Sequence, residues 1–279
     1  MEIIESIEAL RERLSGESSR ALVPTMGNLH AGHLALVRKA GNLASCTVAS
    51  IFVNRLQFGE GEDFDRYPRT FEEDCRKLVE AGTDILFAPT ERELYPEPQQ
   101  FTVDLPPVAK ELCGAHRPGH FSGMATVVLK LFNIVNPHHA VFGKKDYQQL
   151  HLVKGMVSQF NLSVKIAEGD TIREEDGLAM SSRNRYLSPD ERAQAPRLYF
   201  NLEKIASELR CGNRDFSVLE KLAGKDLEAR GWMVDYVEIR DALSLAKPCA
   251  NSSRLVVLGA ARLGKTRLID NLEAGIAQW

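Results

Sequence analysis

The stretch Pro24–His33 gathers residue types that can bind a phosphate group. It reads P-T-M-G-N-L-H-A-G-H, follows the apolar run Ala21–Val23, and leads into Leu34–Ala40, where apolar residues recur at helical spacing. A buried strand therefore feeds a glycine-containing turn that opens a helix. Unbonded N–H groups and the helix dipole at such a start favour an anion. His30 and His33 would share one helix face and offer ring N–H donors to it. The alternative is two solvent-exposed histidines at a helix start.

A second glycine turn carries two lysines. The predicted strand Ala140–Gly143 is followed by Lys144, Lys145 and Asp146, and a helical pattern begins directly after them. Lysine supplies a compact positive charge that suits a phosphoryl oxygen during transfer. We therefore expect the two turns to serve one polyphosphate. Gln149, one helical turn further on, can face the same cleft as Asp146.

Two amide side chains follow the predicted strand Cys46–Val53. Asn54 and Gln57 would emerge at the carboxyl edge of a sheet, where ligands bind in open α/β folds. An amide offers donors and an acceptor without charge, which suits a substrate that carries hydroxyl groups and a carboxylate. A capped strand end is the alternative, and the charged stretch Glu62–Thr70 that follows is typical of a solvated loop.

Two further polar segments have two interpretations each. His116–Phe121 precedes the predicted helix Ala125–Val135 and carries an arginine and two histidines beside a turn glycine. It either holds a carboxylate or phosphate or forms a surface loop. Met180–Asn184 either closes over a bound nucleotide with its hydroxyls and arginine or links two domains.

The segment Gly259–Thr266 matches the phosphate-binding P-loop pattern residue for residue. Thirteen residues follow Thr266, and Arg267–Asp270 has the pattern of a strand, whereas a P-loop requires a helix there. We therefore predict a hairpin turn between two short strands.

Apolar runs alternate with amphipathic stretches through the first two thirds of the chain. This predicts an α/β fold, a doubly wound parallel sheet with helices on both faces and ligands at the carboxyl ends of its strands. The expected strands are 21–23, 46–53, 84–88, 140–143 and 162–167, and the expected helices are 34–43, 71–81, 125–135 and 147–160. Helices at 189–210 and 216–230 and strands at 233–240, 255–258 and 267–269 predict a smaller C-terminal α+β domain. We place the two domains at 1–175 and 176–279.

Composition restricts the class of protein. Five scattered cysteines, an odd number without a Cys-x-x-Cys pair, argue against a disulfide frame or a zinc site and favour a reducing cytoplasm. The net charge of −3 provides no general attraction for nucleic acid. No apolar run approaches the ~20 residues of a membrane helix, and the N-terminus lacks the pattern of a secretory signal.

Together these motifs resemble those of the pantoate–β-alanine ligase family, the pantothenate synthetases. The resemblance covers nearly the whole chain, and the number, order and spacing of the matching segments make it specific. These segments are Pro24–His33, Ser50–Gly59 with Glu62–Thr70, Arg117–Phe121, Ala140–Gln149, Gly177–Leu187 and Arg262–Asn271. The resemblance implies a Rossmann-like domain of the nucleotidyltransferase superfamily with a C-terminal lid domain. It also implies ATP-dependent condensation of (R)-pantoate with β-alanine through pantoyl adenylate. Pyrophosphate and AMP are released, and the product is a precursor of coenzyme A.

The resemblance implies roles for individual residues as well. His33, His30 and Lys145 would act in catalysis, with His33 as the proposed proton donor. Gln57 would contact pantoate and β-alanine, and Gln149 would hold pantoate. The implied ATP-binding positions are Met26, Gly27, Asn28, Leu29, His30, Ala31, Gly32, His33, Gly143, Lys144, Lys145, Asp146, Ile172, Met180, Ser181, Ser182 and Arg183. Mg²⁺ would accompany ATP, with no assigned protein ligands, and the protein would be a cytoplasmic homodimer without nucleic-acid or membrane partners.

The chain departs from the family pattern in three places, which involve four residues. Arg55-Leu56 replaces Pro-Thr, which removes a fixed φ before the amide turn and adds a cation. Lys144 stands where an acidic residue is common, and Cys113 where glutamate is common.

Two other functions remain alternatives at this point. A related nucleotidyltransferase would adenylylate a phosphate, but a phosphate is usually met by arginine or lysine rather than by amides such as Gln57 and Gln149. A nucleotide-sensing or RNA-binding module would use the same cleft. The acidic charge balance and the lack of a basic face studded with aromatic residues argue against RNA.

Overall fold

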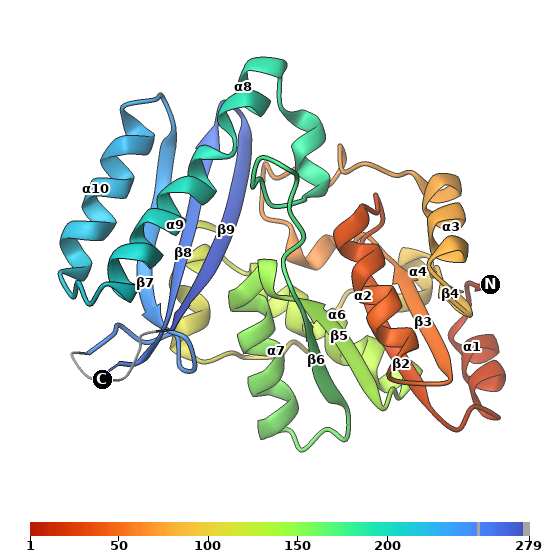
Figure 1. The fold of residues 1–279 in the computed structure, drawn as a ribbon. Helices are drawn as coiled ribbons and strands as arrows, with labels where there is room; N and C mark the ends of the chain where they lie inside the picture. Colours follow the sequence, from red (N-terminus) through yellow and green to blue (C-terminus); the bar gives the residue numbers. More distant parts are fainter. Residues whose placement is uncertain (250–251, 276–279) are drawn as a thin grey trace. The chain divides into compact units, whose positions relative to one another are not determined.

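The computed structural model describes residues 1–249 and 252–275 of the chain (Figure 1). The backbone divides into two compact units, Met1–Lys144 with Leu152–Asp170, and Lys145–His151 with Thr171–Trp279. The domain boundary predicted at residue 175 falls shortly after the start of the second unit's main segment.

The first unit is built on a six-stranded parallel sheet in the order β1-β4-β3-β2-β5-β6. Its strands are β1 (Glu2–Ile4), β2 (Arg20–Thr25), β3 (Cys46–Ile51), β4 (Ile85–Phe87), β5 (His139–Gly143) and β6 (Lys165–Gly169). The five strands expected from the sequence are present, and the sheet confirms the predicted fold class. The sequence does not reveal β1, because three residues are too few to show an alternating pattern.

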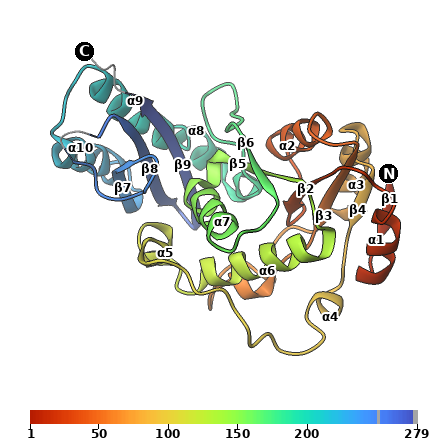
Figure 2. The same cartoon turned by 90° about the horizontal axis from the view of Figure 1, so that it is seen from below.

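Helices cover both faces of this sheet, as predicted (Figure 2). α2 (Ala31–Gly41) and α3 (Phe71–Glu80) lie over one face, where Val37 and Leu78 share a core with Ala21, Val23 and Ala49 of the strands. α6 (His120–Val135) lies over the opposite face and contacts β2. The other helical segments are α1 (Ile7–Leu14), α4 (Glu91–Leu94), α5 (Cys113–His116), η1 (Arg55–Gln57), η2 (Pro107–Lys110), η3 (Lys144–Asp146) and α7 (Tyr147–Gln159).

The start of α6 differs from the prediction. The helix begins at His120 rather than at Ala125, and α5 covers His116, so the predicted loop shrinks to Arg117–Gly119. Gly119, with a φ of 79°, turns the chain into the helix in a conformation that suits glycine. The added turn buries Phe121, so tertiary packing extends the helix beyond its sequence pattern.

The strand order of the first unit reverses between β2 and β5. The chain runs outward from β2 through β3 and β4 and then returns to place β5 on the other side of β2. In open parallel sheets such a reversal leaves a crevice at the carboxyl ends of the two strands, and ligands bind there. Met26 begins the turn after β2 and Lys144 follows β5. Both predicted phosphate turns therefore start at the place where this fold class binds ligands.

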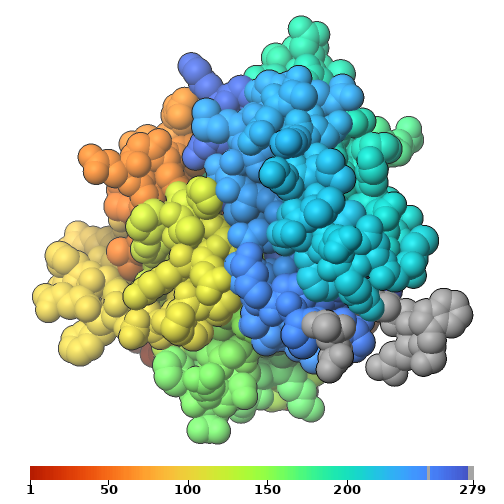
Figure 3. Space-filling model, turned by 90° about the vertical axis from the view of Figure 1, so that its left-hand side faces the viewer, coloured from red at the N-terminus to blue at the C-terminus, as the bar shows by residue number. Residues whose placement is uncertain are grey.

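The second unit contains a three-stranded antiparallel sheet of β7 (Met233–Asp241), β8 (Arg254–Leu263) and β9 (Thr266–Gly275), in that order. α9 (Arg197–Arg210) and α10 (Phe216–Glu228) cover one of its faces, where Leu198, Leu202 and Leu227 share a core with Val257. These helices, teal and light blue in Figure 3, form the outer surface of the unit on the face shown. The arrangement confirms the predicted α+β character of the C-terminal part.

The single helix predicted for 189–210 is wrong. The segment forms α8 (Pro189–Gln194) and α9, and Pro196 separates them because proline lacks the N–H that an uninterrupted helix needs. β8 and β9 are also longer than predicted. Ladder pairing with a neighbouring strand keeps residues of low strand propensity, such as Gly259 and Asn271, extended.

β8 and β9 form the predicted hairpin. Leu263 pairs with Thr266, and Gly264, with a φ of 56°, is the first of the two turn residues, as in a type II′ turn. Thr266 begins a strand, whereas a P-loop requires a helix at this point, so the P-loop alternative is excluded.

Each of the five cysteines, all within the described residues, is present as a thiol. Across residues 1–249 and 252–275, no helix has the length and apolar character needed to cross a membrane.

Candidate active site

A buried carboxylate shapes the turn that follows β2. Gly27 and Asn28 have φ values of 80° and 50°, in the left-handed region. Asp74 of α3 accepts hydrogen bonds from Asn28 N at 2.8 Å and Leu29 N at 2.7 Å, and Thr70 Oγ1 donates to it at 3.1 Å. Sequence reasoning missed Asp74, because an acidic residue in the first turn of a helix is usually explained by the helix dipole.

These bonds correct one expectation about the turn. The N–H groups after β2 were predicted to await an anion, but those of Asn28 and Leu29 donate to Asp74, and Gly27 N donates to Thr25 Oγ1 at 3.2 Å. The backbone of the turn is therefore engaged within the protein. The side chains that the turn carries become its main candidates for ligand contact.

His30 and His33 cap α2 reciprocally. Gly32 N donates to Nδ1 of His30 at 3.2 Å, and His30 N donates to Nδ1 of His33 at 3.3 Å. The ring centroids lie 4.0 Å apart, which confirms that the two side chains share one helix face. Because each Nδ1 accepts a hydrogen bond, each neutral ring carries its proton on Nε2. Both imidazoles are thus oriented as Nε2–H donors.

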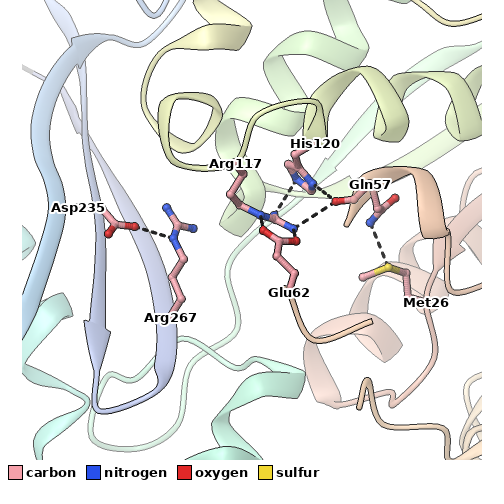
Figure 4. Close-up of polar contacts among 7 residues, drawn as sticks. All are labelled: Met26, Gln57, Glu62, Arg117, His120, Asp235 and Arg267. Atoms are coloured by element: carbon pink, nitrogen blue, oxygen red, sulfur yellow. Dashed lines mark hydrogen bonds and ion pairs between the residues drawn. The ribbon is translucent and has the colours of Figure 1, made fainter. Parts of the chain in front are cut away.

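The amide side chains after β3, those of Asn54 and Gln57, form a buried network, and Figure 4 shows Gln57 with its partner Met26. Gln57 Nε2 donates to Met26 Sδ at 3.0 Å, and Gln57 Oε1 accepts from Asn54 Nδ2 at 3.1 Å. Asn54 Oδ1 in turn accepts from the hydroxyl of Tyr95 at 2.9 Å. Burial raises the pKa of Tyr95, so its hydroxyl keeps its proton and remains a donor. The structure therefore brings together Met26, a predicted ATP contact, and Gln57, a predicted pantoate contact.

A close backbone approach fixes the position of η1. A Cβ atom added to Gly123 of α6 would lie 2.0 Å from the carbonyl oxygen of Leu56, so only glycine fits there. The carbonyl oxygen of Gly123 also accepts from Asn54 Nδ2 at 3.1 Å. α6 thus contacts η1 directly and fixes the position of the main chain that carries Gln57.

Arg117 and His120 hold the other side of Gln57 (Figure 4). His120 Nδ1 donates to the carbonyl oxygen of Gln57 at 2.7 Å, and Arg117 donates to His120 Nε2 at 2.9 Å. Because guanidinium only donates and a carbonyl only accepts, the tautomer of His120 carries its proton on Nδ1. The backbone of Gln57 is therefore held by a defined chain of donors.

The same arginine holds a loop that was expected to be solvated. Arg117 donates to Glu62 through Nε at 2.6 Å and through Nη2 at 2.7 Å. Burial acts to raise the pKa of Glu62, but the hydrogen bonds and charge of Arg117 outweigh it and lower the pKa to about 2. The solvated-loop prediction is wrong at Glu62. The carboxylate that Arg117 holds in this structure belongs to the protein itself.

Arg55, a departure from the family pattern, contacts the same loop. Its Nε donates to Glu91 at 3.0 Å, and its guanidinium carbon lies 3.9 Å from the ring centroid of Phe64. The cation that replaces proline is therefore stacked and paired at the surface.

Lys144 follows Gly143 at the end of β5. Its ammonium lies 3.6 Å from Asp170 Oδ1 and 3.8 Å from Glu168 Oε2, acids at and just beyond the end of β6. The charge of this departure residue is therefore partly balanced by its own unit.

Lys145, Asp146 and Gln149 belong to the second unit. The ammonium of Lys145 lies 3.9 Å from Asp146 Oδ2, and the backbone carbonyl of Lys145 accepts from Asn271 Nδ2 at 2.8 Å. Gln149 lies in the first turn of α7 and is partly exposed.

The predicted nucleotide-closing segment is folded back on itself in the second unit. Met180 N donates to the carbonyl of Ile172 at 3.0 Å, which brings these two predicted ATP contacts together. Ser181 caps η4 (Ser182–Tyr186) by accepting from Arg183 N at 3.3 Å. The segment is therefore a structured loop rather than an extended linker.

An ion pair anchors the base of this loop. Arg173 donates to the two carboxylate oxygens of Asp270 at 2.6 and 2.9 Å, and its guanidinium stacks 3.9 Å from the ring centroid of Tyr199. Burial raises the pKa of Asp270, and the charge of Arg173 opposes that rise. Sequence reasoning missed this pair because 97 positions separate its members.

Within the parts of the chain that the structure describes, no group of three or more His, Cys, Asp or Glu side chains is placed to hold a metal ion.

The fold and these loops define a doubly wound α/β protein with histidine, lysine and amide side chains at or next to the carboxyl ends of its sheet, a class that includes many nucleotide-binding enzymes. The family model described as pantoate-β-alanine ligase matches residues 2–273. Pantothenate synthetase from Nitrosomonas europaea is 60% identical over 271 residues, covering 97% of this chain and 98% of that protein. The enzyme of the same name from Chromobacterium violaceum is 59% identical, covering 98% and 99%.

Solved structures agree with the sequence comparison. Pantothenate synthetase from Thermus thermophilus superposes with a TM-score of 0.94 at 43% identity, covering 99% of this chain and all of that one. A pantoate-β-alanine ligase from Francisella tularensis, complexed with beta-gamma ATP and β-alanine, has a TM-score of 0.82 at 33% identity and covers 98% and 97%. The chain belongs to the pantoate–β-alanine ligase family.

Proposed function

We propose that this chain makes pantothenate from pantoate, β-alanine and ATP in two steps. In the first step a carboxylate oxygen of pantoate attacks the α-phosphorus of ATP, and pyrophosphate leaves with the electrons of the broken P–O bond. In the second step the amine of β-alanine attacks the acyl carbon of pantoyl adenylate, AMP leaves, and the amine loses a proton. The observation that carries this proposal is the family match over residues 2–273. It favours the ligase over the phosphate-adenylylating and RNA-binding alternatives.

The residues support a mechanism without a covalent enzyme intermediate. A carboxylate is a poor acylating agent, and AMP provides it with a good leaving group. The protein must then supply alignment and positive charge where charge develops on phosphorus oxygens. His30 and His33 suit this role because their capping bonds orient both rings as Nε2–H donors. We assign His33 as the proton donor and Lys145 as the charge on the departing pyrophosphate.

Gln57 suits the recognition of pantoate and β-alanine. Its main-chain carbonyl oxygen and its side-chain Oε1 both accept hydrogen bonds, so the side-chain amide is held in one orientation. Its Nε2 donates to the sulfur of Met26, which is a weak acceptor. A carboxylate or hydroxyl oxygen of pantoate would be a stronger partner for that N–H, so substrate can displace the sulfur at little expense. Gln149 is assigned to pantoate on the resemblance.

The remaining ATP contacts are proposed from both units. Met26, Gly27, Asn28, Leu29, Ala31, Gly32, Gly143 and Lys144 come from the first unit, and Asp146, Ile172, Met180, Ser181, Ser182 and Arg183 come from the second. Their pairing within each unit, Met26 with Gln57 and Ile172 with Met180, supports the assignment. We further propose that residues 176–279 act as a lid domain.

ATP would act as its Mg²⁺ complex, a substrate whose cation is held by phosphate oxygens. We also propose a homodimer, which size-exclusion chromatography with light scattering would test. A cytoplasmic location is supported by the five cysteine thiols, because such thiols persist in a reducing compartment.

Separate assays of the two half-reactions test the function. Purified protein with ATP, Mg²⁺ and pantoate should release pyrophosphate, in an amount close to that of the enzyme, before β-alanine is added. Addition of β-alanine should then release AMP and pantothenate. Pyrophosphate release that depends on a phosphate acceptor instead of pantoate would refute the proposal, as would a complete lack of turnover.

A further inference from the structure

Strand β9 carries two adjacent buried polar residues, Asp270 and Asn271, to which the proposed chemistry gives no role. Only 4% of Asp270 and 6% of Asn271 is exposed. Both are in regular register with β8, so successive side chains point to opposite faces of the sheet. Asp270 holds Arg173 on one side of the sheet, and the side chain of Asn271 points to the other side. A buried amide needs hydrogen-bond partners, and one side-chain partner of Asn271 is the carbonyl group of Lys145.

Asn271 contacts the backbone of the proposed phosphate-binding lysine. Its Nδ2 donates to the carbonyl oxygen of Lys145 at 2.8 Å. The carbonyl carbon is bonded directly to the Cα of Lys145, and the peptide group is planar. A bond that fixes the carbonyl therefore restricts the direction in which the Lys145 side chain leaves the backbone.

A second contact from the same face of β9 holds the other end of this short segment. The hydroxyl of Tyr147 donates to Glu273 Oε1 at 2.9 Å and lies 3.1 Å from the carbonyl oxygen of Ala242. Glu273 is two residues beyond Asn271, so both side chains emerge on one face of the strand. The segment from Lys145 to Tyr147 is thus attached to β9 at both ends.

We propose that Asn271 is a positioning residue for the activation of pantoate. It holds the backbone of Lys145 so that the ammonium of Lys145 meets the polyphosphate in the first half-reaction, and it touches no substrate itself. This inference rests on the proposed function, in which Lys145 supplies that charge.

The variant Asn271→Leu removes the donor and keeps the number and branching of the heavy side-chain atoms. Pyrophosphate release from ATP and pantoate should slow roughly 10- to 100-fold, because a displacement of about 1 Å in a positioned group has effects of that size. Aminolysis of added pantoyl adenylate should stay within about two-fold of the unmodified protein, because that step develops no charge on a polyphosphate. Lys265→Ala, in the exposed turn of the same hairpin, is the control and should change neither rate.

A double-mutant cycle with Lys145→Ala tests the route of the effect. If Asn271 acts through Lys145, Asn271→Leu should slow the first half-reaction by less than about three-fold in the Lys145→Ala background, since coupled residues are not additive. The same factor in both backgrounds would overturn the inference, as would an equal loss in both half-reactions.

Two further measurements distinguish loss of the positioning role from misfolding of the variant and from failure of the proposed function. Thermal unfolding of each variant shows whether it is folded. If Asn271→Leu does not fold, Asn271→Ser replaces it in the same assays. The serine hydroxyl is too short to reach the carbonyl oxygen of Lys145. A normal first half-reaction in a folded Asn271 variant refutes the positioning role alone. Lack of pyrophosphate release by the unmodified protein refutes the proposed function instead.

Discussion

The ion pair between Glu62 and Arg117 should make the stability of the protein depend on pH in a defined way. Its side chains are only 23% and 13% exposed, so water and salt screen the pair weakly. The variant Glu62→Gln keeps the size of the side chain and an acceptor oxygen but removes the charge. It leaves the guanidinium of Arg117 largely buried without its counter-ion, and an unpaired buried charge lowers the free energy of unfolding strongly.

The size of the effect follows from the pKa of Glu62, which the structure lowers from 4.5 to about 2. At about 1.4 kcal/mol per pKa unit, the ionised carboxylate favours the folded state by about 3 kcal/mol. Because the pKa is lower in the folded state than in the unfolded chain, this contribution is complete above about pH 4.5. It is lost as the pH falls from there towards 2.

Urea unfolding followed by circular dichroism, from pH 3 to pH 8, measures this contribution. Glu62→Gln should be about 3 kcal/mol less stable than the unmodified protein at pH 7, and the difference should shrink by roughly 1.4 kcal/mol per pH unit below pH 4.5. Glu60→Gln, an exposed neighbour in the same loop, should stay within about 0.5 kcal/mol at every pH. A difference for Glu62→Gln that does not change with pH would refute the electrostatic explanation.

Three further substitutions test the site. His33→Ala should lower kcat about 100-fold or more, with a much smaller change in the KM for ATP, because a donor aimed at developing charge acts mainly in the transition state; equal effects on ground-state and transition-state binding would contradict that role. Gln57→Ala should chiefly raise the KM for pantoate, about ten-fold for one lost hydrogen bond near 1.4 kcal/mol, and unchanged pantoate kinetics would remove it from the pocket. Lys265→Ala should leave ATP binding intact in calorimetry, and loss of binding by a folded variant would revive the P-loop alternative.

Local patterns predicted most of the regular structure. The alternation of apolar runs with amphipathic stretches identifies five strands of the parallel sheet, and the strand pattern of Arg267–Asp270 correctly distinguishes a hairpin from a P-loop. The break at Pro196 was accessible too, since proline alone disfavours a helix interior. β1 was not, because it extends only from Glu2 to Ile4 and is held by pairing with β4.

The residue types of the candidate site were predictable from the sequence, but their hydrogen-bond partners were not. The spacing of His30 and His33 predicts a shared helix face, and the two ring centroids lie 4.0 Å apart. The sequence does not indicate that their Nδ1 atoms accept backbone hydrogen bonds, nor that Asp74 occupies the N–H groups expected to await an anion. A carboxylate on a distant helix competes for these donors only after the chain has folded.

Residue order by itself determined the turns, the helix-forming and strand-forming segments and the residue types at the strand ends, because these depend on neighbours a few positions away. Three contacts were decided by the tertiary structure alone. Gly123 allows α6 to pack closely against η1, and Arg117 forms an ion pair with Glu62. Asn271 donates a hydrogen bond to the carbonyl oxygen of Lys145. The last two residues are 126 positions apart, and no local preference encodes their contact. Such pairs form because polar groups that folding buries away from water must hydrogen-bond to other groups of the protein.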